Sequence, residues 1–346
     1  MVRILVTGSD GYIGTMLTPM LRDAGHEVVG LDSCLFRTCS FGEDTLDGDM
    51  VRMDVRDVEH EDLVGFDAVV HLAAISNDPL GDLNPQTTFE INHEATIELA
   101  EKARAAGISR FVFSSSCSLY GAQGDVFIDE SGTFNPITPY GVSKARCERD
   151  LHAIASDEFS PTYLRNATVY GASPRLRGDL VVNNLTGYAF ATGKVFLKSD
   201  GSSWRPLIHV DDVCRAFVAV IAADRTVVHD EAFNVGATEE NYQIREVAEM
   251  VHEAMPECAV AVSDEAFDDP RNYRVDCDKL ASVLPEATPQ WTVRAGIEQL
   301  FSAYREHGLR LEDLEGDRFM RVRHIGSLIA AGRIDERLRW VADGGR

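Results

Sequence analysis

Three glycines near the start of the chain constrain its fold more than any other feature. The segment Ile4-Leu-Val-Thr-Gly8-Ser-Asp-Gly11-Tyr-Ile-Gly14 runs from a β-branched stretch into a helical pattern. Gly8 permits a tight turn, Gly11 lets the backbone approach a pyrophosphate, and Gly14 lets a helix pack closely on a strand. An ordinary strand-to-helix connection can carry the same glycines, so the turn alone leaves both interpretations open.

The first half of the chain alternates short apolar runs with helical patterns, which is typical of βαβ units and a parallel sheet. The rhythm changes after about Ser173. The sequence therefore predicts an α/β fold, with a doubly wound parallel sheet in residues 1–172. Residues 173–346 are expected to form mainly a smaller, interleaved substrate lobe, with some segments returning to the sheet.

Individual elements follow from the periodicity of the apolar residues. The predicted strands are Arg3–Val6, Glu27–Leu31, Ala68–Leu72, Arg110–Ser114 and Thr162–Arg165. The predicted helices are Tyr12–Ala24, Pro85–Ala106, Tyr140–Ala155, Leu180–Thr192, Asp211–Ala223, Ile244–Met255 and Val293–His307.

Net charge limits the partners that this chain can bind. Its 346 residues carry a formal net charge of −23, which would repel a nucleic-acid backbone or an anionic membrane over much of the surface. No run approaches the ~18 apolar residues of a membrane span, and the first residues lead directly into a strand without room for a cleavable leader. We expect no nucleic acid and no membrane as partner, and an anionic ligand needs a local pocket of arginines and helix N-termini.

Cysteine and histidine usage bears on location and on metals. The seven cysteines (34, 39, 117, 147, 214, 258 and 277) form no C-x-x-C pair, which predicts reduced thiols in a cytoplasmic protein. The ten histidines form no H-x-H or H-x-x-x-H cluster, so we expect no metal site.

A tyrosine and a lysine stand one helical turn apart in Tyr140-Gly-Val-Ser-Lys144. Side chains at i and i+4 project from the same helix face. An ammonium held there favours the phenolate and lowers the proton affinity of the tyrosine, as a general base acting on a sugar or alcohol hydroxyl requires. Exposed pairs on ordinary helices show the same spacing, so the interpretation needs support from elsewhere in the chain.

Two acidic residues, Asp32 and Asp54, support the binding of a dinucleotide. Asp32 ends the second predicted strand, where a carboxylate can accept hydrogen bonds from an adenosine ribose and would repel a 2′-phosphate. This favours NAD over NADP. Asp54 and Val55, in Met53-Asp54-Val55 further along the chain, could reach the adenine ring, although a solvated turn also explains Asp54.

With the glycine turn, the Ser116/Tyr140/Lys144 set and His71-Leu-Ala-Ala-Ile-Ser76, the chain resembles the extended short-chain dehydrogenase/reductases that act on nucleotide sugars. It looks most like the UDP-galactose 4-epimerase group. The match runs from residue 2 to about residue 280. The resemblance implies a Rossmann-type fold, NAD as cofactor, a nucleotide-diphosphate sugar as substrate, and a homodimer formed through the helices predicted at 85–106 and 140–155.

The resemblance also implies roles for single residues. Tyr140 would be the acid/base, Lys144 its electrostatic partner and a ribose ligand, and Ser116 the hydroxyl that steadies the reacting oxygen. The implied cofactor contacts are Gly8, Gly11, Tyr12, Ile13, Gly14, Asp32, Asp54, Val55, Leu72, Ala73, Ala74, Asn92, Ser114, Tyr140, Lys144 and Ala167. The implied substrate contacts are Ser76, Ser116, Cys117, Ser118, Tyr140, Thr168, Asn184, Leu185, Phe196, Arg205 and Arg271.

Departures from the family pattern narrow the chemistry. Sugar 4,6-dehydratases carry an Asp-Glu pair where this chain has Cys117-Ser118, and neither residue supplies the carboxylates that eliminate water. Cys117 is better explained by packing, because relatives with a catalytic cysteine carry it at the position of Ser118. A second phosphate-binding arginine of the family is missing, and Arg271 is the candidate replacement.

The leading hypothesis is an NAD-dependent nucleotide-sugar epimerase that acts at C4 through a 4-keto intermediate. An NAD(P)H-dependent reductase of nucleotide-4-keto sugars uses the same three residues and stays open as an alternative. A dinucleotide-binding regulator that has no catalytic activity is a more remote alternative. The basic tail after Gly308 lies beyond the resemblance, and the sequence gives no functional account of it.

Overall fold

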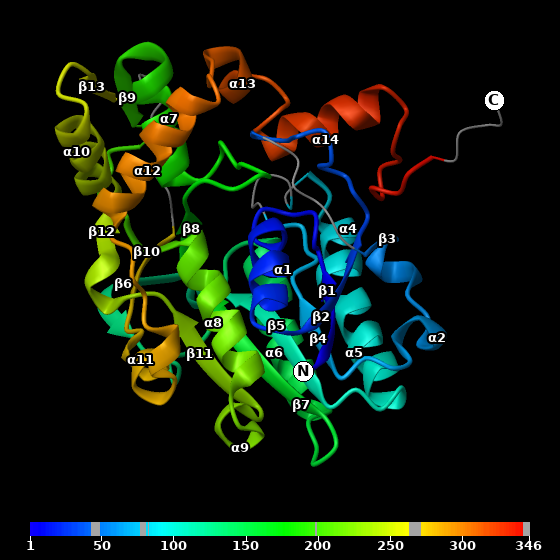
Figure 1. The fold of residues 1–346 in the computed structure, drawn as a ribbon. Helices are drawn as coiled ribbons and strands as arrows, with labels where there is room; N and C mark the ends of the chain where they lie inside the picture. Colours follow the sequence, from blue (N-terminus) through cyan, green and yellow to red (C-terminus); the bar gives the residue numbers. More distant parts are fainter. Residues whose placement is uncertain (43–48, 77–80, 82, 198, 263–270, 342–346) are drawn as a thin grey trace.

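The computed structural model describes residues 1–42, 49–76, 81, 83–197, 199–262 and 271–341. Within these residues the centre of the molecule is a sheet of seven parallel strands in the order β11-β7-β5-β4-β1-β2-β3 (Figure 1). The order of the strands reverses between β1 and β4, which places a ligand crevice at their carboxyl ends. The strands are β1 (Arg3–Thr7), β2 (Glu27–Asp32), β3 (Met50–Arg52), β4 (Ala68–His71), β5 (Arg110–Ser116), β7 (Ser160–Asn166) and β11 (Glu231–Val235).

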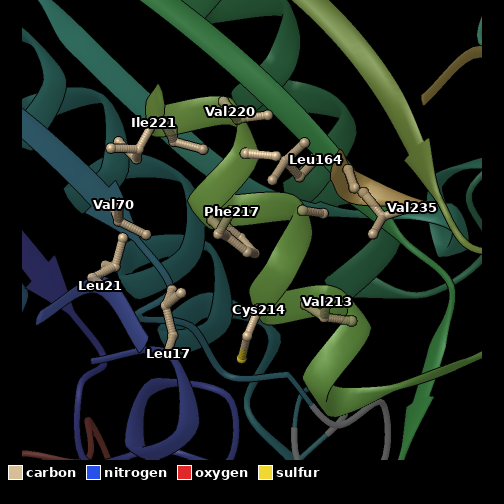
Figure 2. Close-up of a cluster of buried hydrophobic side chains, with 14 of the residues drawn as sticks. Leu17, Leu21, Val70, Leu164, Val213, Cys214, Phe217, Val220, Ile221 and Val235 are labelled. Atoms are coloured by element: carbon tan, nitrogen blue, oxygen red, sulfur yellow. The ribbon is translucent and has the colours of Figure 1, made fainter. Parts of the chain in front are cut away.

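Helices cover both faces of the sheet because each strand alternates its apolar side chains between the two sides. On one face, Leu17 and Leu21 pack with Phe217 over Val70, as Figure 2 shows. On the other face, Leu99 and Leu151 belong to a second core. The helices are α1 (Gly14–Asp23) and α8 (Val210–Ala222) in the first core, and α5 (Ala95–Ala105) and α6 (Pro139–Ala153) in the second.

A second lobe has a core of its own, in which Leu185, Val247 and Leu300 are buried together. This part of the chain contains three small sheets. Its strands are β6 (Ala122–Ile128), β8 (Thr168–Tyr170), β9 (Lys194–Leu197), β10 (Trp204–His209), β12 (Asn241–Gln243), β13 (Ala259–Val262) and β14 (Asn272–Val275). Its helices are α7 (Val181–Thr192), α10 (Ile244–Ala254), α12 (Val293–Glu306) and α13 (Leu311–Glu315). Four short helices elsewhere in the chain are α2 (His60–Leu63), α4 (Pro85–Phe89), α9 (Arg225–Val228) and α11 (Asp278–Val283).

The predicted α/β doubly wound fold is confirmed, and the predicted strands and helices agree with the structure to within one or two residues at most ends. The helix predicted at 85–106 differs, because a π-helical turn at Glu90–Glu94 separates α4 from α5. After residue 173 the chain returns to the main sheet, where α8 packs on α1 and β11 pairs with β7. No helix within the described ranges is long and apolar enough to cross a bilayer.

The last helix, α14 (Arg321–Ala330), and residues 331–341 lie against the N-terminal half of the chain (Figure 1). Trp340 donates its indole N–H to the carbonyl of Ser33 at 2.7 Å. Arg339 forms an ion pair with Asp57 at 2.7 Å. The tail is therefore part of the folded body beside the end of β2.

Candidate active site

A cavity of about 580 Å³ opens at the carboxyl ends of β1, β4, β5 and β7 and continues to α7 and β9 of the second lobe. Such a volume suits a bound small molecule or cofactor. The structure describes all of the residues predicted to contact cofactor or substrate, and it places all but two of them on the wall of this cavity. The exceptions are Asn92 and Cys117.

Glycines form the cavity wall where β1 leads into α1. Gly8 has a φ of 74°, and a Cβ there would lie 2.7 Å from the backbone nitrogen of Ala73. A Cβ on Gly14 would lie 2.2 Å from the carbonyl oxygen of Gly8. Side chains are therefore excluded at both positions, so that a diphosphate can approach the backbone at the N-terminus of α1 closely. This cradle fits a dinucleotide.

Asp32 stands at the end of β2, next to the glycine turn. Its carboxylate accepts hydrogen bonds from the backbone N–H groups of Cys34 at 2.7 Å and Asp10 at 3.0 Å. Burial is the largest influence and raises the pKa of Asp32 to about 6. A carboxylate at this position is suited to accept the hydroxyls of an adenosine ribose.

The affinity for NAD is expected to fall as the pH is lowered from 7 to 5. Asp32 has a pKa of about 6, so below this pH it becomes neutral and loses its capacity to accept hydrogen bonds from both ribose hydroxyls. One unit below the pKa the ionised fraction is roughly a tenth, so the dissociation constant should rise about tenfold at pH 5. Calorimetric titration measures this change, and Asp32→Asn should bind weakly with little pH dependence. A constant wild-type affinity over this range would contradict the assignment.

Helix α6 carries the tyrosine and lysine toward the end of β5. The helix begins at Pro139, and the Thr138 hydroxyl accepts the N–H of Gly141 at 3.2 Å, which are favourable N-terminal features. Gly141 also matters for packing, since a Cβ there would lie 3.0 Å from the carbonyl oxygen of Ser118. The first turn of α6 is thereby held close to the chain that follows Ser116.

Lys144, one of the three predicted catalytic residues, is almost fully buried. Its Nζ donates to the carbonyl of Ser114 at 2.6 Å and lies 5.7 Å from the centre of the Tyr140 ring. Burial lowers the pKa of Lys144 to about 8. Ser116 ends β5, and its hydroxyl accepts the N–H of Ser118 at 3.1 Å. All three side chains line the cavity, as expected for a proton-transfer centre.

A buried ion pair fixes α6 against the sheet below this centre. Arg165 of β7 binds the carboxylate of Glu148 of α6 through Nη2 at 2.7 Å, and both side chains are about 5% exposed. The hydroxyl of Ser115 donates to the same carboxylate at 2.5 Å. Glu148 is one turn after Lys144, so this network sets how the catalytic face of α6 meets β5.

The cavity is cationic although the chain is strongly acidic. Arg205 stacks near Tyr273 and donates to the carbonyl of Trp204 at 2.7 Å, as well as to the carbonyl of Arg271. The amide of Asn184 donates to the carbonyl of Gly178 at 2.6 Å. The basic residues that line the cavity in the described part of the chain are Lys144, Arg177, Arg205, Arg271 and Arg321. The local pocket of positive charge that an anionic ligand needs is therefore present.

Three charged residues of the cavity were absent from the predicted site, namely Arg177, Asp179 and Arg321. Arg177 donates to the hydroxyl of predicted substrate residue Ser76 at 3.1 Å, and it is held by Asp179 at 3.0 and 2.9 Å. They lie in the loop after Gly171, before α7. For Arg177 and Asp179 the available signal was an arginine two residues before an aspartate, in a loop that leads to the predicted substrate contact Asn184.

Asn92 and Cys117 lie outside the cavity wall, which differs from their predicted cofactor and substrate contacts but agrees with the packing role expected for Cys117. Asn92 lies in the π-helical turn, and its amide binds the backbone of Ile75 through both atoms at 2.7 and 2.9 Å. It therefore shapes the chain after β4 from behind the cavity wall. Cys117 is fully buried and donates to the carbonyl of Arg165 at 3.0 Å, while burial raises the pKa of its thiol. Both are structural, because neither side chain reaches the cavity.

One group of potential metal ligands occurs among the described residues, formed by Asp10, Asp32 and Cys34. The Asp10 carboxylate is already paired with Arg175 at 2.6 Å. Burial raises the pKa of the Cys34 thiol to about 11, which keeps it protonated. A guanidinium and a protonated thiol do not suit a metal ion, so this cluster gives no reason to propose one.

Known proteins resemble this chain along most of its length. The model of the NAD dependent epimerase/dehydratase family matches residues 4–236. A UDP-glucose 4-epimerase of Mycolicibacterium smegmatis is 30% identical over 325 residues, covering 88% of this chain and 99% of that protein. One of Corynebacterium glutamicum is 29% identical over 267 residues, or 73% and 80% of the two chains. The structure of MoeE5 in complex with UDP-glucuronic acid and NAD is 30% identical, with a TM-score of 0.76 and coverages of 88% and 99%.

Proposed function

The chain belongs to the NAD-dependent epimerase/dehydratase family, and from this membership we propose that it inverts C4 of a UDP-linked sugar through a 4-keto intermediate. NAD is the cofactor, in keeping with the family and with the glycine cradle at the start of α1. A UDP-sugar as substrate is supported by the relatives, among them two UDP-glucose 4-epimerases.

One observation carries the proposal. Tyr140, Lys144 and Ser116 meet on the wall of a single cavity that also contains the glycine turn at one end and two arginines at the other. A proton-transfer centre therefore lies between a dinucleotide cradle and a cationic region suited to a diphosphate.

The residues of this centre divide the chemistry among them. Bound NAD supplies a reversible acceptor for hydride. The nearby Lys144 ammonium favours the phenolate of Tyr140, which takes the proton from the C4 hydroxyl and becomes a phenol; this phenol returns the proton in the reverse step. Ser116 supplies a hydroxyl that hydrogen-bonds the reacting oxygen. Arg205 and Arg271 hold the diphosphate while the sugar turns to present its other face.

The composition of the cavity disfavours elimination of water. The acidic residues that line it within the described ranges are Asp32, Asp54 and Asp179. Asp32 is the last residue of β2, Asp54 follows β3, and Asp179 is paired with Arg177 at 2.9 Å. Ser118 contributes only a hydroxyl beside the catalytic serine. The described wall therefore offers no second carboxylate beside the paired Asp179 in the second lobe, so it supplies no acid and base pair suited to dehydration.

Incubation with single UDP-sugars tests this function. Purified protein given UDP-glucose, UDP-galactose or UDP-glucuronic acid, without added cofactor, is expected to convert one of them to its C4 epimer. Proton NMR identifies the product, and absorbance at 340 nm should show no net change. Conversion without a net change is expected because the same hydride leaves and returns.

Two other outcomes would overturn the proposal. Stoichiometric consumption of added NADH or NADPH with a 4-keto sugar would assign the chain as a nucleotide-4-keto-sugar reductase. Binding of NAD without turnover of any nucleotide sugar would support the regulator without catalysis.

We also propose a cytoplasmic homodimer. The family resemblance supports the dimer, and seven free, buried cysteines support a reducing compartment. Sedimentation equilibrium should give twice the 38.1 kDa of one chain, and cell fractionation should place the protein with soluble cytoplasmic enzymes. A single-chain mass, or a membrane fraction, would contradict these two statements.

A further inference from the structure

The C-terminal segment, residues 320–341, forms part of the cofactor end of the cavity although it lies beyond the family match. Met320, Arg321, Ile325 and Leu338 line the cavity together with Asp32 and its neighbours. The segment contacts both the chain after β2 and the π-helical turn at Glu90–Glu94. His324 hydrogen-bonds the carbonyl of Leu35 at 2.9 Å, Trp340 binds that of Ser33 at 2.7 Å, and Arg337 pairs with Glu90 at 2.9 Å.

Arg321 is the polar residue that this segment brings to the cavity wall. Its side chain is 4% exposed, and its guanidinium lies 4.0 Å over the ring of Phe36. Nη2 donates to the carbonyl of Arg175 at 3.0 Å. Nη1 is buried and has no hydrogen-bond partner among the residues that the structure describes.

The surroundings of Arg321 call for an anion. Burial is the main cause that lowers its pKa to about 10, and the positive charge of Arg177 adds to the effect. A buried guanidinium with an unused donor is unfavourable unless a negative group meets it. Asp179 and the Cys39 thiol lie near enough to raise this pKa, but neither hydrogen-bonds Nη1 within the described part of the chain.

The position of Arg321 identifies which anion would meet it. Arg175, whose carbonyl Arg321 binds, reaches back to the glycine turn and pairs with Asp10 at 2.6 Å. Phe36, on which Arg321 stacks, follows Asp32 by four residues. Through Arg175 and Phe36, Arg321 is thus connected to the glycine turn and to the chain after Asp32, the two segments between which a dinucleotide places its diphosphate.

We propose that Arg321 binds the diphosphate of NAD through Nη1, and that the C-terminal segment thereby holds the cofactor in the cavity. The proposal deepens the function above and rests on it only for the identity of the cofactor. Because its test measures binding without any sugar, its failure is distinguishable from the failure of the epimerase assignment.

Titration of the cofactor-free protein with NAD, ADP and adenosine tests the contact. Arg321→Gln is expected to weaken NAD and ADP about 10- to 100-fold, as for loss of a charge-assisted hydrogen bond, and to leave adenosine unchanged. Arg323→Gln is the matched control, because Arg323 is exposed on the same helix. It should leave all three affinities unchanged.

Arg321→Met provides a second variant if the Gln variant folds poorly. Its apolar side chain retains the packing on Phe36 and removes a buried charge, so the cofactor-free Tm should not fall. The rise in Tm on adding NAD should be smaller than in the wild type. Equal losses of ADP and adenosine affinity, or unchanged NAD affinity in either variant, would overturn the proposal.

Discussion

Replacing Tyr140 with phenylalanine is expected to lower kcat for C4 epimerisation roughly 10²- to 10⁴-fold, the usual contribution of a positioned acid/base. The change removes the phenolic oxygen and leaves the ring, so the packing of α6 should be retained. Calorimetric titration should show NAD affinity close to that of the wild type, because the glycine cradle and Asp32 are unchanged. NMR of the product mixture gives the rate.

Tyr242→Phe is the matched control for this experiment. Tyr242 is half-buried in β12, donates to Glu240 at 3.3 Å and is absent from the cavity wall. Its loss of one hydroxyl should leave kcat within a factor of about two, since surface substitutions of this kind perturb a protein little. If Tyr140→Phe retained more than a tenth of the wild-type kcat, Tyr140 would not be the proton carrier.

Arg165→Met is expected to lower the free energy of unfolding by about 3–5 kcal/mol. The substitution leaves the buried carboxylate of Glu148 with the hydroxyl of Ser115 but without its cationic partner. An uncompensated buried charge is more costly than the loss of the pair, so Arg165→Met/Glu148→Met should recover much of the stability. Urea unfolding followed by circular dichroism measures all three proteins.

The control for this prediction is the ion pair between Arg294 and Glu253 on the surface. Both side chains are more than half exposed, at 59% and 58%. The same Arg-to-Met change at Arg294 should therefore alter stability by only about 0–1 kcal/mol. Equal effects of Arg165→Met and Arg294→Met would show that the buried network does not anchor α6.

The parts of the molecule that were predictable from sequence are those in which local signals and tertiary packing agree. Strand β5 carries a short-range apolar pattern, α6 has Pro139 in its first turn, and Tyr140 and Lys144 share a face because of helical geometry alone. The glycine turn was predictable for a similar reason. The lack of a Cβ at Gly8 and Gly14 is visible in the sequence and is required by contacts in the structure.

The residues that were misplaced or missed depend on contacts distant in the chain. Asn92 lies within what reads as one continuous helix, and only the π-helical turn directs its amide to Ile75. Arg321 reaches Phe36, which is 285 residues earlier, so no local pattern reveals their contact. Arg177 obtains its place from Asp179 and from Ser76 of another segment.

The contribution of residues 320–341 to the cavity wall has a consequence for biosynthesis. A chain emerging from the ribosome can form β1, α1 and β2 early, because they are consecutive. The wall of the cofactor site also contains Leu338, so the site is complete only after at least that residue has been translated and has left the ribosome. NAD bound by the complete site therefore stabilises the finished protein and cannot act through these contacts on nascent chains.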